Sequence, residues 1–237
     1  MVPTPTWHRF ASSEELADAL AQSVAKTLAK GVEERGQAVL AVSGGRTPAH
    51  FFDRLSRSDI AWNKVTVTLV DERFVPGDSP RSNARLVTRH LLQNKAARAG
   101  FIGLYSPCHN AETAAAEANE AIGSLPSPFD VVVLGMGADR HTASFFPDAA
   151  DIGDMLSARE GGPSVLAVSA RSAGEPRLTL SLDKLSTARM LVVHIEGDDK
   201  KETLEEALAM PAGPASPIGA VLTAAQNPAH VYWAPLR

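Results

Sequence analysis

Asp139 and His141 are the residues of this sequence whose types and spacing point most clearly to chemistry. They stand two positions apart within residues 130–148, which read DVVVLGMGADRHTASFFPD. An imidazole can take up and return a proton near neutral pH, and a nearby carboxylate can hold its orientation. A lone His after a strand is more often structural, but the adjacent carboxylate favours a catalytic base. We therefore expect a proton-transfer site here.

Residues 43–48, SGGRTP, form a candidate anion-binding loop. The two glycines let the backbone approach a phosphate closely, the Arg adds positive charge, and the Thr-Pro pair is typical of a helix start. The alternative is a tight turn with an exposed Arg. The Gly-Lys-Ser/Thr ending of a nucleotide P-loop is absent, so a phosphorylated small molecule is the expected ligand. The candidate binding residues are Ser43, Gly44, Gly45, Arg46 and Thr47.

Further charged residues follow other strand-like runs. Asp71, Glu72 and Arg73 come directly after the apolar run 65–70 and could bind sugar hydroxyls and a carbonyl or phosphate, although three charges in a row also suit a solvated turn. Arg177 begins a later strand. Lys200 lies in the first turn of a predicted helix, where a cation is disfavoured unless it binds something. Each late cation alone suits a solvated surface, but together they supply positive charge for an anion.

The elements that carry these residues alternate between strand and helix patterns. We expect strands at residues 7–10, 37–42, 65–70, 101–105, 131–134, 164–169, 177–181, 190–195 and 230–233. We expect a helix after the Ser12–Glu15 capping pair, with an apolar face from Leu16 to Val32, and helices at residues 48–55, 82–92, 111–125 and 198–210. Residues 182–187 suit a short helix or turn, residues 217–222 suit a helical turn, and a short helix is expected soon after Ser144. This order predicts an α/β protein with a mainly parallel sheet and helices on both faces, folded as a single domain over residues 1–237. Ligands then bind beyond the carboxyl ends of the strands.

Composition excludes several classes of protein. The chain has 237 residues, of which 44% are hydrophobic and 21% charged, and its formal net charge is −4, which argues against nucleic-acid or anionic-membrane partners. Cys108 is the only cysteine, so no intramolecular disulfide and no Cys-based zinc site are expected. The histidines lack metal-ligand spacing, so we expect no metal. The start lacks the apolar core of a signal peptide and no run is long enough to span a membrane, so we expect a cytoplasmic protein.

Four segments together resemble the 6-phosphogluconolactonases. They are SGGRTP, then DERFVP followed by Ser82-Asn83, then LGMGADRHTASFFP, and then Gly-Asp-Asp-Lys ending at Lys200. The third segment is the most diagnostic, and the resemblance runs from about Ala38 to Ala207. It implies a Rossmann-like three-layer fold related to the glucosamine-6-phosphate deaminases. It also implies hydrolysis of 6-phospho-D-glucono-1,5-lactone to 6-phosphogluconate in the oxidative pentose phosphate pathway, without a cofactor.

The resemblance assigns roles to individual residues. His141 is the implied general base that activates water, Asp139 orients it, and Arg73 binds near the reacting end of the lactone. The implied phosphate and sugar contacts are Ser43, Gly44, Gly45, Arg46, Thr47, Gly137, Arg177 and Lys200, and either of the last two can hold the phosphate. Asp71 and Asn83 are implied hydroxyl or loop-ordering contacts.

One residue departs from the family pattern. The family reads Asp-Gly-His where this chain has Arg140 in the middle. A positive φ there would cost an Arg about 1–2 kcal/mol; alternatively, Arg140 is an extra contact to the phosphate or the carboxylate. We expect an active enzyme regardless.

Two other functions remain as alternatives. A glucosamine-6-phosphate deaminase would share the fold, but its pattern has Glu five residues after the His, where this chain has Phe146. A non-catalytic sugar-phosphate sensor would keep SGGRTP and Lys200 without needing the Asp139–His141 pair. Nothing in the sequence demands more than a monomer.

Overall fold

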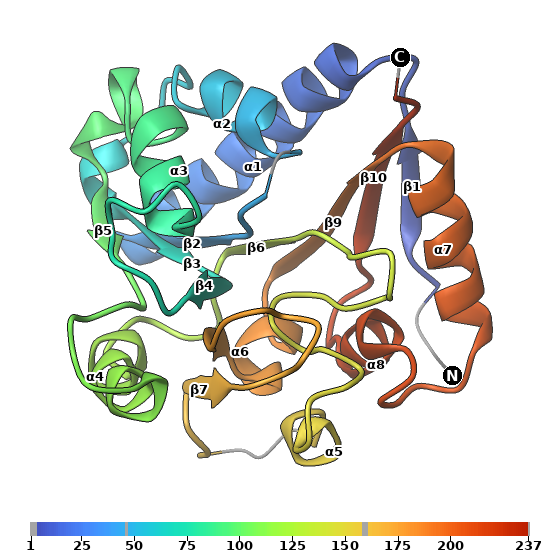
Figure 1. Cartoon of the computed structure of the whole chain (residues 1–237). Coiled ribbons are helices and arrows are strands. Elements are labelled where there is room, and N and C mark those ends of the chain that lie inside the picture. Colours follow the sequence, from blue (N-terminus) through green and yellow to red (C-terminus); the bar gives the residue numbers. More distant parts are fainter. Residues whose placement is uncertain (1–3, 46, 158–160, 237) are drawn as a thin grey trace.

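A seven-stranded parallel sheet forms the centre of the protein (Figure 1). The computed structural model describes residues 4–45, 47–157 and 161–236. The strand order is β1-β10-β9-β6-β2-β3-β5, and every neighbouring pair is parallel. The strands are β1 (Thr6–Arg9), β2 (Ala38–Val42), β3 (Val65–Leu69), β5 (Gly100–Ile102), β6 (Val131–Leu134), β9 (Met190–Glu196) and β10 (His230–Ala234). The predicted α/β class and parallel sheet are confirmed.

Helices cover both faces of this sheet, as Figure 1 shows. One group contains α1 (Ser13–Arg35), α2 (Ala49–Leu55) and α3 (Asn83–His90), and the other contains α6 (Leu182–Ser186), α7 (Asp198–Ala209) and α8 (Pro217–Ala224). Two further helices are α4 (Ala111–Gly123) and α5 (Ile152–Met155). None of the helices in the described ranges is long and apolar enough to cross a membrane.

A small antiparallel sheet stands apart from the main one. It consists of β4 (Asp71–Arg73), β8 (Arg177–Leu180) and β7 (Val165–Val168), in that order. The charged triplet after β3 is therefore a paired strand, so the alternative of a solvated turn is wrong. Because β4 and β8 are in register, Arg73 stands opposite Arg177.

The local signals for strands and helix starts mostly hold. All four residues of β6 are buried, as its continuous apolar sequence predicts. Ser12 caps α1 by accepting a hydrogen bond from the backbone N–H of Glu15 at 3.2 Å, and Ser82 caps α3 in the same way. These caps set where the helices begin.

Two local expectations were wrong. The helix after SGGRTP begins at Ala49 with Pro48 at the cap, so Thr47 does not cap it. No helix begins near Ser144, because the Thr142 and Ser144 hydroxyls bond to other segments: Thr142 donates to the carbonyl of Gly135 at 2.8 Å, and Ser144 donates to Asp71 Oδ2 at 2.7 Å. Such bonds compete with helix formation, and the next helix is α5.

Candidate functional site

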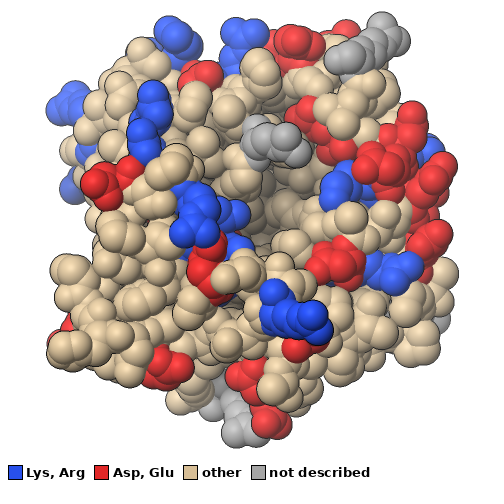
Figure 2. Space-filling view, viewed as in Figure 1, with Lys and Arg blue, Asp and Glu red and all other residues tan. Residues whose placement is uncertain are grey.

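A cavity of about 370 Å³ opens beyond the carboxyl ends of β2, β6 and β9. Figure 2 shows a hollow on this face with Lys and Arg side chains at its rim. Most of the predicted site residues line the cavity, namely Ser43, Gly44, Gly45, Thr47, Asp71, Arg73, Asn83, Gly137, His141, Arg177 and Lys200. Segments far apart in the sequence thus meet as the parallel topology requires, because strand carboxyl ends share one edge.

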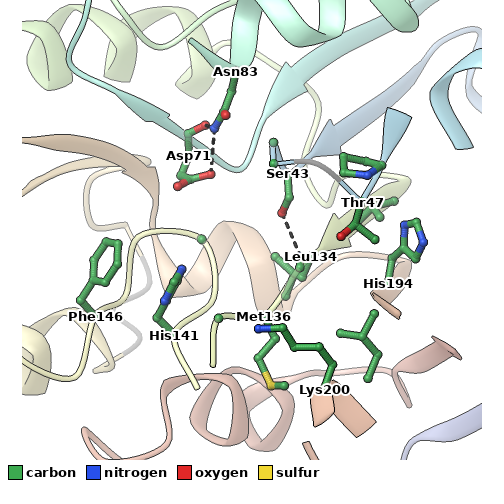
Figure 3. Close-up of a pocket in the computed structure, with 18 of the residues that line it drawn as sticks. Ser43, Thr47, Asp71, Asn83, Leu134, Met136, His141, Phe146, His194 and Lys200 are labelled. Atoms are coloured by element: carbon green, nitrogen blue, oxygen red, sulfur yellow. Dashed lines mark hydrogen bonds between the residues drawn. The ribbon is translucent and has the colours of Figure 1, made fainter. Parts of the chain in front are cut away.

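The Asp139–His141 pair forms as the sequence suggests. His141 Nδ1 lies 2.5 Å from Asp139 Oδ1, and the His141 ring projects into the cavity (Figure 3). A carboxylate accepts only, so Nδ1 carries the proton and Nε2 is the basic nitrogen. The two side chains are 31% and 42% exposed, which leaves the imidazole open to water and substrate.

The turn that carries this pair depends on its backbone. Arg140 has φ 68°, and the backbone N–H of Gly137 donates to the carbonyl of His141 at 2.9 Å, which closes the turn. A Cβ on Gly137 would overlap the His141 ring and Asp139 Oδ1. Gly137 is therefore required by the packing of the pair, whatever contact it makes with substrate.

Arg140 departs from its expected place. It is absent from the cavity lining, and its guanidinium pairs with Glu206 of α7 at 2.8 Å. The positive φ considered for this position is present, and the Arg140 guanidinium lies against Glu206 rather than in the lining of the cavity. In this structure Arg140 forms an ion pair, and its contact with a substrate stays a prediction.

Arg73 and Arg177 form a cationic wall next to the imidazole. The Arg177 guanidinium lies 5.6 Å from the Phe146 ring centroid, and that ring lies 4.4 Å from the His141 ring. Burial, and then the charge of Arg73, lowers the pKa of Arg177 from its ordinary value. The Nε atoms of both arginines are buried and form no hydrogen bond within the described chain. Arg177 is buried and Arg73 is partly buried, and such cations are suited to an anion or a developing oxyanion.

Asp71 and Asn83 form the upper wall of the cavity in Figure 3. Asn83 Nδ2 donates to the carbonyl of Asp71 at 2.8 Å and to its Oδ1 at 3.3 Å. Ser144 Oγ donates to Asp71 Oδ2. A Cβ on Gly44 would overlap Asn83, so the SGG loop packs directly on this network. The loop-ordering role expected for Asp71 and Asn83 is visible in these bonds.

Glu72 serves the fold rather than the cavity. Its carboxylate is fully buried and accepts hydrogen bonds from the backbone N–H groups of Arg73, Asn83 and Ala84, at 2.7 to 2.8 Å. Burial raises its pKa, and these bonds oppose the rise. Glu72 thereby ties β4 to the start of α3, and the expectation that it could bind sugar hydroxyls was wrong.

The loop after β2 runs from the Asp71–Asn83 network to the turn after β6. Ser43 Oγ accepts from the backbone N–H of Gly135 at 3.1 Å, which fastens this loop to the turn after β6 (Figure 3). Gly45 has φ 97°, a conformation that favours glycine. Lys200 reaches the same space from the first turn of α7. Arg46 lies outside the described residues.

Several residues in the cavity wall escaped prediction as site residues, among them Phe146, His194 and Glu196. Phe146 packs on the His141 ring. His194 Nε2 lies 3.1 Å from Glu196 Oε1, and both belong to β9. The spacing of two places both side chains on one strand face, and this signal could have identified the pair. Within the described ranges, no group of three or more metal-ligating side chains occurs.

Comparison with known proteins identifies the family. Residues 11–233 match the model for glucosamine-6-phosphate isomerases/6-phosphogluconolactonase. The chain belongs to this family. A 6-phosphogluconolactonase of Mesorhizobium japonicum is 54% identical to this chain, over 97% of this chain and 95% of the relative. A 6-phosphogluconolactonase of Rhizobium meliloti is 50% identical, over 96% of this chain and 98% of the relative. A crystal structure of a 6-phosphogluconolactonase from Shewanella baltica superposes with a TM-score of 0.94 at 39% identity, covering 99% of each chain. Family and fold therefore agree with the resemblance in the sequence.

Proposed function

We propose that this protein hydrolyses 6-phospho-D-glucono-1,5-lactone to 6-phosphogluconate. The observation that carries the proposal is the Asp139–His141 pair, held at 2.5 Å in a cavity beside Arg73 and Arg177. A lactone is an activated ester, so its hydrolysis needs a base for water and donors for the oxyanion. Both requirements are met by residues on one wall.

The first step is attack by water on the lactone carbonyl. His141 Nε2 takes one proton from the water as its oxygen bonds to C1, and Asp139 stabilises the resulting imidazolium through Nδ1. The carbonyl electrons move to the oxygen, and Arg73, with Arg177 beside it, stabilises the negative charge that forms there. Donors aimed at developing charge act strongly in a desolvated site.

The second step opens the ring. The tetrahedral intermediate collapses, the bond from C1 to the ring oxygen breaks, and the imidazolium gives its proton to that oxygen. The product carries a free hydroxyl and a carboxylic acid, which ionises at neutral pH. His141 returns to its neutral form, so the cycle balances without a cofactor.

The phosphate is assigned to the other side of the cavity. The SGG loop supplies backbone N–H groups without side-chain crowding, and Lys200 supplies charge. Arg177 lies with Arg73 on the wall of the reacting centre, so we assign Lys200 rather than Arg177 to the phosphate. This division leaves the cationic wall free to act on the reacting end.

Phe146 favours hydrolysis over the isomerase chemistry of the same family. Phe146 stands five residues after His141, at the position where the pattern of the glucosamine-6-phosphate deaminases has Glu. Its ring packs on the imidazole, with the ring centroids 4.4 Å apart. An apolar ring there cannot transfer a proton. We therefore propose a lactonase rather than a deaminase.

The deciding experiment measures hydrolysis of freshly generated lactone above its spontaneous rate. His141→Ala should lower kcat/KM by about 10²- to 10⁴-fold, the usual contribution of a positioned base. His90→Ala is the matched control, because His90 pairs with Asp53 at 3.1 Å outside the cavity and should leave the rate unchanged. Equal rates for wild type and His141→Ala would refute the mechanism. Retained binding of 6-phosphogluconate by His141→Ala would support the assignment of the phosphate to other residues.

A further inference from the structure

The cavity contains a second carboxylate–imidazole pair, which the proposed mechanism does not use. His194 and Glu196 are two residues apart on β9, and Ser13, at the start of α1, donates from Oγ to Glu196 Oε2 at 2.6 Å. The edge of the His194 ring packs on Phe51 of α2, with centroids 6.2 Å apart. His194 is only 4% exposed, yet it lines the cavity.

The hydrogen bonds locate the protons of this pair. Burial by itself raises the pKa of Glu196, but the bonds from His194 and Ser13 outweigh that effect and hold the pKa below its ordinary value. An ionised carboxylate only accepts, so the proton on this side of the imidazole sits on Nε2 of His194. Nδ1 forms no hydrogen bond with the part of the chain that the structure describes. It is therefore the polar atom that His194 can offer to a ligand.

The position of the pair indicates which part of a ligand it meets. In Figure 3, His194 stands near Thr47, on the opposite side of the cavity from His141, and Lys200 reaches in below. This is the side to which the phosphate is assigned above. The charged and titratable groups around His194 are Glu196, Lys200, His50 of α2 and Tyr232, its register partner on β10.

The charge of the pair depends on one proton. With a neutral imidazole the pair carries −1, which repels a phosphate; with an imidazolium it carries no net charge and Nδ1 becomes a donor. A phosphate that enters the cavity therefore favours the protonated form. Binding and protonation are linked, so each strengthens the other.

We propose that His194 binds the substrate's phosphate through Nδ1 and takes up a proton when the phosphate enters. The inference rests on the proposed function for the identity of the ligand. Glu196 and Ser13 act as positioning residues, because the bond between Nε2 and Glu196, which Ser13 also holds, fixes the ring and leaves Nδ1 without a partner among the described residues. The linkage makes phosphate binding weaken as the pH rises.

The test is calorimetric binding of 6-phosphogluconate at neutral and mildly alkaline pH, in buffers of different ionisation enthalpy. Wild type should take up protons on binding. His194→Gln keeps a group that can reach Glu196 but offers nothing at the Nδ1 position. It should bind about 10-fold or more weakly, as expected when a charge-assisted hydrogen bond is lost, and with less proton uptake. His90→Gln is the control and should match wild type in both readouts.

Kinetics and a second ligand separate a binding role from a structural one. His194→Gln should raise KM for the lactone more than it lowers kcat, and its KM should depend less on pH than that of wild type. Gluconate, which lacks the phosphate, should bind wild type and variant alike. Wild-type affinity and proton uptake in His194→Gln would overturn the inference while leaving the lactonase proposal intact. Failure of wild type to bind 6-phosphogluconate would overturn both.

Discussion

The two carboxylate–imidazole pairs of the cavity use the same groups at the same spacing but stand in different surroundings. His141 and Asp139 lie in a turn, 2.5 Å apart, with side chains 31% and 42% exposed. His194 and Glu196 lie on β9, 3.1 Å apart, with side chains 3% and 9% exposed. The first pair is open to solvent in the cavity. The second is largely enclosed by protein.

The two pairs therefore differ in backbone setting rather than in residue type. On a strand, residues two apart face the same way because of the pleat, so the pair on β9 needs no special conformation. In the turn, the same proximity requires the left-handed conformation of Arg140 and the bare backbone of Gly137. Such a costly conformation is consistent with a site where geometry matters for chemistry.

Asp139→Asn tests the catalytic pair most severely. An amide in place of the carboxylate can favour the wrong imidazole tautomer and cannot stabilise the imidazolium, so kcat should fall by about 10²- to 10⁴-fold. The assay is lactone hydrolysis corrected for the spontaneous rate. Asp53→Asn, which alters the carboxylate–imidazole pair with His90 outside the cavity, should have no effect. A loss of less than threefold in Asp139→Asn would remove the distinction between the two pairs.

Gly137→Ala tests whether the turn requires a residue without a side chain at position 137. The new methyl would overlap His141 and Asp139, and displacing a catalytic group by about 1 Å can cost about 10²-fold in rate. We expect kcat to fall by about 10- to 100-fold, with KM changing less. Gly153→Ala is the control, since a methyl there meets nothing within 4 Å. Wild-type kcat in Gly137→Ala would show that the pair tolerates repositioning.

Ser13→Ala tests the enclosed pair through stability. Removing the Ser13 hydroxyl should lower the free energy of unfolding by about 1 kcal/mol at neutral pH. Because the folded pKa of Glu196 is lowered, its stabilising effect is full above the unfolded pKa and is lost as pH falls through the folded pKa.

The cost of Ser13→Ala should therefore shrink in acid, which urea unfolding at neutral and acid pH would measure. Ser124→Ala removes a hydroxyl that donates to the carbonyl of Ala121, so its cost should be the same at both pH values. A pH-independent cost in Ser13→Ala would mean that Glu196 is not the group being stabilised.

Arg140→Gly has the smallest expected effect. Glycine relieves a positive φ worth about 1–2 kcal/mol, while the partly exposed ion pair with Glu206 contributes about 0–1 kcal/mol. We expect a free energy of unfolding equal to or slightly above wild type, and a lactonase rate within threefold. Undetectable activity in wild type that Arg140→Gly restores would refute the view that this chain is active with Arg140.

Much of the fold was readable from local patterns. The apolar run predicted strand β6, and the Ser12 and Ser82 caps predicted where α1 and α3 begin. The alternation of strands and helices predicted the parallel sheet. These features were predictable because each signal acts over a few residues. Strand β4 could not be read in this way. Its three charged residues look solvated until β8 pairs with them, and that partner lies about a hundred residues away in the sequence.

The residues of the candidate site likewise fall into those that local sequence patterns predicted and those that contacts between distant segments place there. We could predict the Asp139–His141 pair, the glycine loop at residues 43–45, and the cations Arg177 and Lys200 from the sequence, because the chemistry of each is visible within a few residues. Other features required the tertiary structure. Arg73 stands opposite Arg177, and Arg140 pairs with Glu206. Glu72 is buried at the start of α3, and the His194–Glu196 pair lines the cavity. The physical reason is that burial, and the partner of each charge, are set by segments that are distant in sequence.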